Sequence, residues 1–144
     1  RLTPHPMLPL FDAPDGVAAC TNRDRSNVPV QALSLLNDPA LVECAQSLAR
    51  FVARSDQGTD SERLESLMRI CLARDAHPVE RDVLLRLLER QRSELKTDLS
   101  LSAQINGQSD GELQTQGAVW IADAAAWTVV ARVVMNLDEF ITRE

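Results

Sequence analysis

Six of the seven prolines lie within the first 39 residues, at positions 4, 6, 9, 14, 29 and 39. Each proline ring fixes φ and removes a backbone donor, so a segment interrupted this often cannot propagate a helix. The sequence therefore predicts an extended, loop-like lead-in over residues 1–28. Pro29 and Pro39 are different, because a proline is well tolerated in the first turn of a helix, where its missing N–H is not needed.

Beyond the lead-in, apolar residues recur at helical spacing. Leu41, Ala45, Leu48 and Val52 step by four, three and four residues, which is the spacing of one helix face. Further helices are predicted over residues 29–36, around 62–72, from Pro78 onward and over 118–141. The helix after Pro78 carries an apolar stripe of Val79, Val83, Leu84, Leu87, Leu88 and Leu95. No segment alternates with period two, so we expect an all-α fold, an irregular bundle of about five helices within a single domain over residues 1–144.

Two segments are less regular. Residues 97–117 are rich in Ser, Gln, Asn and Gly, which predicts a weak helix or a mobile insertion. The last predicted helix is apolar almost all round, except that Thr128, Arg132 and Asn136 follow each other at intervals of four. A helix of this kind belongs in the centre of a bundle, with its polar stripe against a polar partner.

The charge balance excludes some classes of partner. The chain has 21 acidic against 15 basic residues, a formal charge of −6, and residues 98–144 hold seven acids against two bases. A nucleic-acid binder needs a cationic surface, so no nucleic-acid partner is expected. Asp123, Arg132 and Asn136 interrupt the longest apolar stretch, which therefore predicts a buried helix and no membrane insertion.

The ends of the chain and its cysteines bear on its context. The sequence begins at Arg1 without a signal segment and ends directly after an apolar run. We interpret it as a piece of a longer protein, whose other domains are its expected partners. Cys20, Cys44 and Cys71 are odd in number and too widely spaced for a metal knuckle. Cys44 and Cys71 are predicted as core thiols, and one disulfide stays possible if the parent protein is exported.

Several short motifs occur in a distinctive order. They are FDAPD at residues 11–15, then Cys20, Arg23 and Ser26, PVQAL at 29–33, LNDP at 36–39, LAR at 72–74 before Pro78 and Glu80, and the run from Trp127 to NLDEF at 136–140. In this order the chain resembles the family called domain of unknown function 1553, a C-terminal domain of planctomycete-type multidomain proteins. Ala73 stands where that family usually has Gly, and His77 where it has a Thr or Ser cap.

The resemblance implies a context but no reaction. Members look like exported or cell-envelope proteins, often with a companion domain of unknown function and sometimes with a cytochrome-c-like domain. The family name brings no catalytic residue. The expected function is a non-catalytic structural or interaction module, and no cofactor or metal is predicted. The alternative is a domain that contributes loop residues to an active site for polysaccharide or redox chemistry.

The densest polar cluster of the lead-in supplies the residues for that alternative. It contains Asp12, Asp15, Arg23 and Arg25, with Gln31 nearby in the first predicted helix. Two carboxylates three residues apart could bind a hard cation such as Ca²⁺. The other interpretation is that the acids form turns around Pro14 while the arginines form ion pairs.

Other polar residues are predicted to be structural. Asn37 and Asp38 lie at a helix junction and are interpreted as caps, as is Glu80 near the positive end of a helix dipole. Arg132 and Asn136 lie on the apolar last helix. Because burying an unpaired guanidinium is costly, we expect Arg132 to pair with an acid of the lead-in, Asp12 or Asp15. His5 with Cys20 is the one conceivable catalytic dyad, since no nucleophile, phosphate or metalloprotease motif accompanies it.

Overall fold

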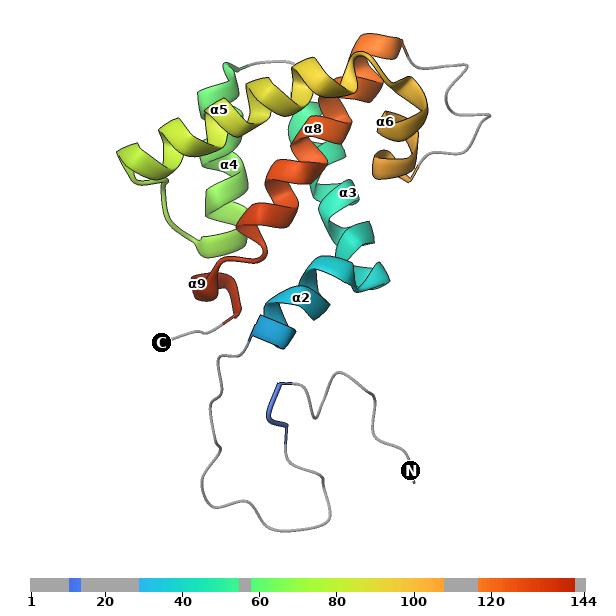
Figure 1. Ribbon diagram of the computed structural model, residues 1–144. Helices are drawn as coiled ribbons and strands as arrows, with labels where there is room; N and C mark the ends of the chain where they lie inside the picture. Colours follow the sequence, from blue (N-terminus) through green and yellow to red (C-terminus); the bar gives the residue numbers. More distant parts are fainter. Residues whose placement is uncertain (1–10, 14–28, 55–57, 108–116, 142–144) are drawn as a thin grey trace. The chain divides into compact units, whose positions relative to one another are not determined.

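The computed structural model describes residues 11–13, 29–54, 58–107 and 117–141. These residues form seven helices and no strand (Figure 1). The all-α prediction is confirmed, while the expected number of about five helices was too low. The predicted lead-in over residues 1–28 lies almost wholly outside the described residues.

The chain divides into two compact units, Arg1–Asp38 and Pro39–Glu144. The described helix of the first unit is α2, Pro29–Asn37. A single residue separates it in the sequence from α3, Pro39–Ala53, with which the second unit begins. Both helices start at a proline, as predicted. The expectation of one domain over residues 1–144 stays a prediction.

The second unit is built around one apolar helix. Its elements after α3 are α4 Asp60–Leu72, α5 Pro78–Leu95, α6 Leu99–Asn106, α8 Ala118–Val134 and α9 Asp138–Ile141. α8 packs against α3, α5 and α6, and it crosses the middle of the unit in Figure 1. Trp127 of α8 is fully buried, and alanines such as Ala124 and Ala131 let the neighbouring helices approach closely. The prediction of a central apolar helix is confirmed.

The predicted inner face of α3 lies in the core, as does one face of α4. Ala45 and Val52 of α3 are buried, with Leu41 and Leu48 packed against the same core. In α4 the buried residues are Leu64, Leu67 and Met68. α4 begins with a capping box, in which Thr59 accepts from the Glu62 amide and the Glu62 carboxylate accepts from the Thr59 amide.

Three residues that were predicted to be buried are exposed. On α5 the buried leucines are Leu84, Leu88 and Leu95, whereas Val79 is 74% exposed and Val83 is 50% exposed. Val83 is one residue away from that buried line, which is about 100° around the helix. Cys44 is exposed for the same reason, because the buried line of α3 starts at its neighbour Ala45.

The predicted helix over residues 118–141 is in fact two helices. α8 ends at Val134, and α9 begins at Asp138. Between them the amides of Asn136 and Leu137 donate to the carbonyls of Val133 and Val134. These i to i−3 bonds tighten the last turn and end the α-helix. The acidic residues Asp138 and Glu139 then open α9, where a helix dipole favours negative charge.

Residues 99–106 form α6, so the weak-helix alternative holds for this part of the predicted insertion. Asp98 caps the helix by accepting from the Leu101 amide, and Gly107 ends it with φ of +64°. Residues 108–116 lie outside the described residues. The apolar pattern of α6 is weak because this helix is held by buried polar contacts rather than by an apolar stripe.

Candidate functional site

The densest group of polar contacts in the second unit surrounds the turn between α4 and α5. α4 ends at Leu72, its cap residue Ala73 has a φ of +56° that reverses the chain, and α5 begins at Pro78. Glu80 is the third residue of α5 and accepts a hydrogen bond from the His77 amide at 2.8 Å. A proline in the first turn followed by a glutamate that reaches back to the cap is a common helix start. Local sequence therefore places both the turn and the Glu80 carboxylate.

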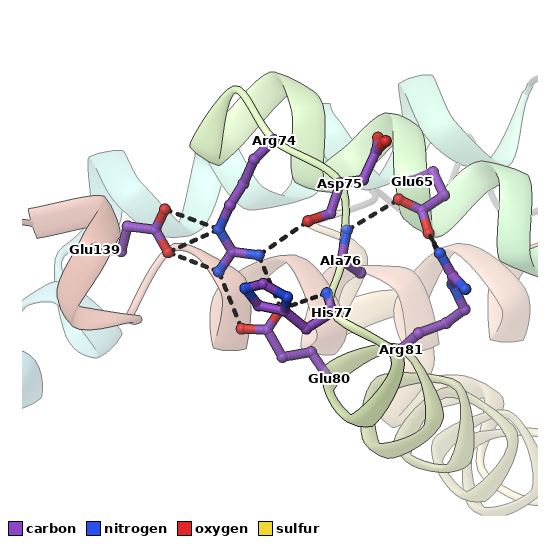
Figure 2. Close-up of polar contacts among 8 residues, drawn as sticks. All are labelled: Glu65, Arg74, Asp75, Ala76, His77, Glu80, Arg81 and Glu139. Atoms are coloured by element: carbon purple, nitrogen blue, oxygen red, sulfur yellow. Dashed lines mark hydrogen bonds and ion pairs between the residues drawn. The ribbon is translucent and has the colours of Figure 1, made fainter.

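Arg74 lies at the centre of this group, between two glutamates (Figure 2). Its Nε and Nη2 donate to Glu139 of α9, with Nε 2.9 Å from Oε1 and Nη2 2.6 Å from Oε2. Its Nη1 and Nη2 donate to Glu80, at 2.8 Å from Oε2 and 3.0 Å from Oε1. Nη1 also donates to the Asp75 carbonyl. A planar guanidinium with five N–H donors suits this double role, which the point charge of a lysine could not fill.

These contacts keep both glutamates ionised. Hydrogen bonding to Arg74 lowers the pKa of Glu80 to about 2, and the His77 amide contributes to that shift. Arg74 also lowers the pKa of Glu139, and the two carboxylates together raise the pKa of Arg74. The charges of Arg74 and of the two glutamates therefore do not change over the pH range in which acid–base catalysts usually titrate.

Glu65 of α4 holds the other side of the same turn. Its carboxylate accepts from the buried amide of Ala76 at 3.0 Å and from Arg81 Nε at 2.7 Å (Figure 2). A second ion pair joins Arg69 to Asp75. The turn from α4 to α5 is thus tied at several points to α4, to α5 and to α9.

A second ionic group joins α4, α5 and α8. Arg92 of α5 donates to Asp60 with Nη1 2.8 Å from Oδ2, and to Asp123 with Nε 2.6 Å from Oδ1. The hydrogen bond from Arg92 lowers the pKa of Asp60, and Asp60 in turn raises the pKa of Arg92. This contact explains why an acidic residue, Asp123, lies on a nearly apolar helix: its carboxylate pairs with a partly buried cation.

A third group consists of buried polar residues and the half-buried Arg50, which fix α6 between α3 and α8. Gln46 Nε2 donates to the Ile105 carbonyl and Arg50 Nη1 to the Asn106 carbonyl, both at 2.9 Å. The fully buried Asn106 donates to the Ile121 carbonyl, and its Oδ1 lies 3.4 Å from Thr128 Oγ1. Thr128 also donates to the Ala124 carbonyl at 2.9 Å. Thr128, the first residue of the predicted polar stripe, therefore meets a polar partner on another helix.

The predicted cluster in the lead-in falls mostly outside the described residues. Asp15, Arg23 and Arg25 lie there, as do His5 and Cys20. Asp12 is described and has a left-handed φ of 54°, which Asp tolerates better than most residues. Gln31 is buried within α2. The grouping of these five residues stays a prediction.

The predicted structural residues are better described. Asn37 is the last residue of α2, and its Nδ2 donates to the Leu33 carbonyl at 2.7 Å. Asp38 directly precedes α3, and its amide donates to the Ser34 carbonyl at 2.8 Å. Arg132 is half-buried in the last turn of α8, and Asn136 follows the end of that helix. The pairing of Arg132 with Asp12 or Asp15 stays a prediction, because Asp15 is not described and Asp12 belongs to the other unit.

Three residues that hold helices together were not predicted from the sequence. They are Glu65, Arg92 and Asn106, whose partners lie on other helices. One signal was available for Asn106, because an Asn-Gly pair is typical of a helix end, with Gly in the left-handed position. Arg74 was noticed only as part of a motif, and no pattern in the sequence connects it to Glu139, 65 residues away.

Within the part of the chain that the structure describes, no three His, Cys, Asp or Glu residues are grouped so that they could hold a metal ion. Among these same residues, no helix has both the length and the apolar character needed to cross a bilayer.

Comparison with known proteins identifies the family of the chain but no individual relative. Neither the curated proteins nor the solved structures contain a match. A family model, described as a protein of unknown function, DUF1553 (PSD1), matches residues 1–88. The matched region includes α2, α3 and α4, and it contains the turn in which Arg74 binds Glu80. The chain belongs to the DUF1553 family.

Proposed function

We propose that this chain is a non-catalytic structural or interaction module of a larger exported multidomain protein. The family resemblance supports a C-terminal position in a planctomycete-type protein. Its partners would be other domains of the same polypeptide, held in place by a helical body whose own helices are firmly connected.

The observation that carries this proposal is the double pairing of Arg74. One guanidinium binds Glu80 at the start of α5 and Glu139 in α9, so a single side chain connects three parts of the fold. Arg92 likewise connects α4, α5 and α8 by binding both Asp60 and Asp123. Side chains used in this way hold a fixed shape, and their pKa values are moved away from neutrality rather than towards it.

An interaction role also needs an accessible surface. Val79 and Val83 are exposed and lie one turn apart on α5, so they form a small apolar face. Central apolar side chains dominate the energy of many protein interfaces. We therefore place the contact with a neighbouring domain on this face of α5.

The proposal is tested in the full-length parent protein by cross-linking and mass spectrometry. Replacing Val79 and Val83 by Glu should remove the cross-links between α5 and another domain, because two charges would have to be buried at the contact. Val119 is similarly exposed at 72% on α8, so Val119→Glu is the matched control and should leave the cross-links unchanged. Equal cross-linking in both variants would reject α5 as the contact.

The second candidate function is an active site that uses loop residues 12–25. It rests on the clustering of Asp12, Asp15, Arg23 and Arg25 in the sequence. The parent protein with Asp12→Asn and Arg23→Gln distinguishes the two proposals. Loss of an activity of the parent, with its domain contacts and thermal unfolding unchanged, would favour the active-site alternative.

A further inference from the structure

A groove of about 570 Å³ lies between the end of α3 and the beginning of α4. α3 contributes Ser47, Arg50 and Phe51, Arg54 directly follows α3, and α4 contributes Glu62 and Arg63. The first four residues are spaced by three, one and three, and the Arg54 amide donates to the Arg50 carbonyl, so they share one helix face. The volume is within the range of about 300 to 1,000 Å³ that small-molecule sites occupy. None of these residues takes part in the Arg74 group.

The groove is cationic although the chain as a whole is acidic. Among the described residues that line it, three arginines face one glutamate, in a protein with a formal charge of −6. Of the three, Arg63 pairs with Asp60 and Asp123, so Arg50 and Arg54 carry the argument. Arg50 donates its hydrogen bonds to neutral groups, namely the Asn106 carbonyl and Ser47 Oγ. The Arg54 side chain makes no ion pair with the described residues. Positive charge therefore remains available on the α3 side of the groove.

Glu62, the one acid among the described residues of the groove, already has hydrogen-bond donors. The Glu62 carboxylate accepts from both the amide and the hydroxyl of Thr59, at 2.7 Å and 3.1 Å. These bonds lower the pKa of Glu62, so it remains an ionised helix cap. Glu62 is directed to the start of its own helix and does not pair with Arg50 or Arg54.

Phe51 adds an apolar wall beside these cations. Phe51 is 67% exposed, although phenylalanine is among the residue types most often buried in proteins. An aromatic ring at the edge of a groove offers a surface on which another planar group can stack. The combination of an aromatic ring and guanidinium groups suits a ligand with a ring and an anionic group.

We propose that this groove binds a small organic anion, whose carboxylate or phosphate pairs with Arg50 and Arg54 while its ring packs on Phe51. This proposal is independent of the proposed structural role, because the groove and the α5 face share no residue.

The test titrates the protein with four probes and follows backbone amide signals by NMR. Benzoate and phenyl phosphate carry both a ring and an anion, whereas inorganic phosphate lacks the ring and phenol lacks the charge. Saturable binding of benzoate or phenyl phosphate, with shifts centred on residues 47–54, is the expected result. The stronger of the two identifies the anionic group. No saturable binding of either probe would overturn the proposal.

Variants separate a site from general charge attraction. Arg54→Glu should weaken binding at least about fivefold, which corresponds to loss of one exposed ion pair. Lys96→Glu, an equal charge change at an exposed position at the end of α5, should change it less than about twofold. Equal weakening by both variants would overturn the proposal.

Phe51→Ala should also weaken binding, with the exposed Val79→Ala as its control. Inorganic phosphate binding as tightly as phenyl phosphate would overturn the role of the ring.

Discussion

Arg74 and Glu139 lie 65 residues apart in the sequence, yet Arg74 Nη2 is 2.6 Å from Glu139 Oε2. This contact connects the turn between α4 and α5 with the short helix α9. The same guanidinium binds Glu80, so three charged groups from three segments share one hydrogen-bonded arrangement (Figure 2). Several expected outcomes depend on this arrangement and on the turns around it.

Acid should weaken the fold through Glu80. The pKa of Glu80 is lowered from 4.5 to about 2 in the folded protein. A lowered pKa contributes stability that is fully present above the unfolded value and is lost as the pH falls towards the folded value. We expect the free energy of unfolding to fall between about pH 5 and pH 2, measured by urea denaturation.

The variant Glu80→Gln isolates this contribution. Its free energy of unfolding should be lower than that of the wild type at neutral pH, and it should fall less steeply with acid. Glu89→Gln is the matched control, because Glu89 is an exposed glutamate of the same helix and forms no ion pair with the described residues. Parallel pH curves for Glu80→Gln and the wild type would contradict the prediction.

Ala73→Gly should stabilise the protein. Ala73 has a φ of +56°, a conformation in which its Cβ approaches the following carbonyl and which glycine adopts without strain. We expect a gain of about 0.5–1 kcal/mol, since relief of strain is partly offset by the greater freedom of glycine in the unfolded chain. Ala40→Gly, on an ordinary helical turn of α3, should destabilise by about the same amount. A loss of stability in Ala73→Gly would show that the turn is not strained.

Gly107→Ala should destabilise the junction of α6 with α3. Gly107 has a φ of +64°, and a Cβ there would lie 2.5 Å from Gln46 Oε1. The expected cost is about 1–3 kcal/mol by chemical denaturation, from backbone strain together with the displaced amide. Gly117→Ala is the control, because no atom lies within 4 Å of the added methyl group. In a Gln46→Ala background, Gly107→Ala should cost less; an unchanged cost would mean that backbone strain alone is responsible.

Thr128→Val should loosen the contact of α8 with α6. The substitution keeps the shape of the side chain but removes the hydroxyl beside the fully buried Asn106 Oδ1. An unsatisfied buried acceptor costs about 1–3 kcal/mol. The same substitution in an Asn106→Ala background should cost about 1 kcal/mol less, which a double-mutant cycle measures. Additive costs would show that the two side chains do not interact.

The two described cysteines should react at very different rates. Burial raises the pKa of the Cys71 thiol to about 11, whereas Cys44 is exposed on α3. Because the thiolate is the reactive form, an aromatic disulfide reagent at about pH 8 should modify Cys44 first and Cys71 at least about tenfold more slowly. Cys44→Ser should remove the fast phase and Cys71→Ser should leave it. Fast modification of Cys71 in the folded protein would contradict its burial.

Helix positions were largely predictable because their signals are local. Pro29, Pro39 and Pro78 each begin a helix in the structure, as the sequence indicated. The inner face of α3 followed from apolar spacing for the same reason. The end of α8 did not follow from local signals, because the break after Val134 depends on how α9 folds back to bring Glu139 to Arg74.

The candidate site was predictable only in part. Glu80 could be placed at a helix start, because the cap involves residues three apart. Its pairing with Arg74 and Glu139, and the meeting of Asn106 with Thr128, join residues on different helices. In each of these contacts, the local sequence around one residue does not indicate its partner.

The sequence by itself determined that the chain is helical, where most helices begin, and which family it resembles, since prolines, caps and apolar periodicity act within a few residues. Only the tertiary structure decided which charges pair, which valines and cysteines remain exposed, and that α6 is held by buried polar groups. Those outcomes depend on distances between helices, which the packing around Trp127 and the small residues of α8 sets.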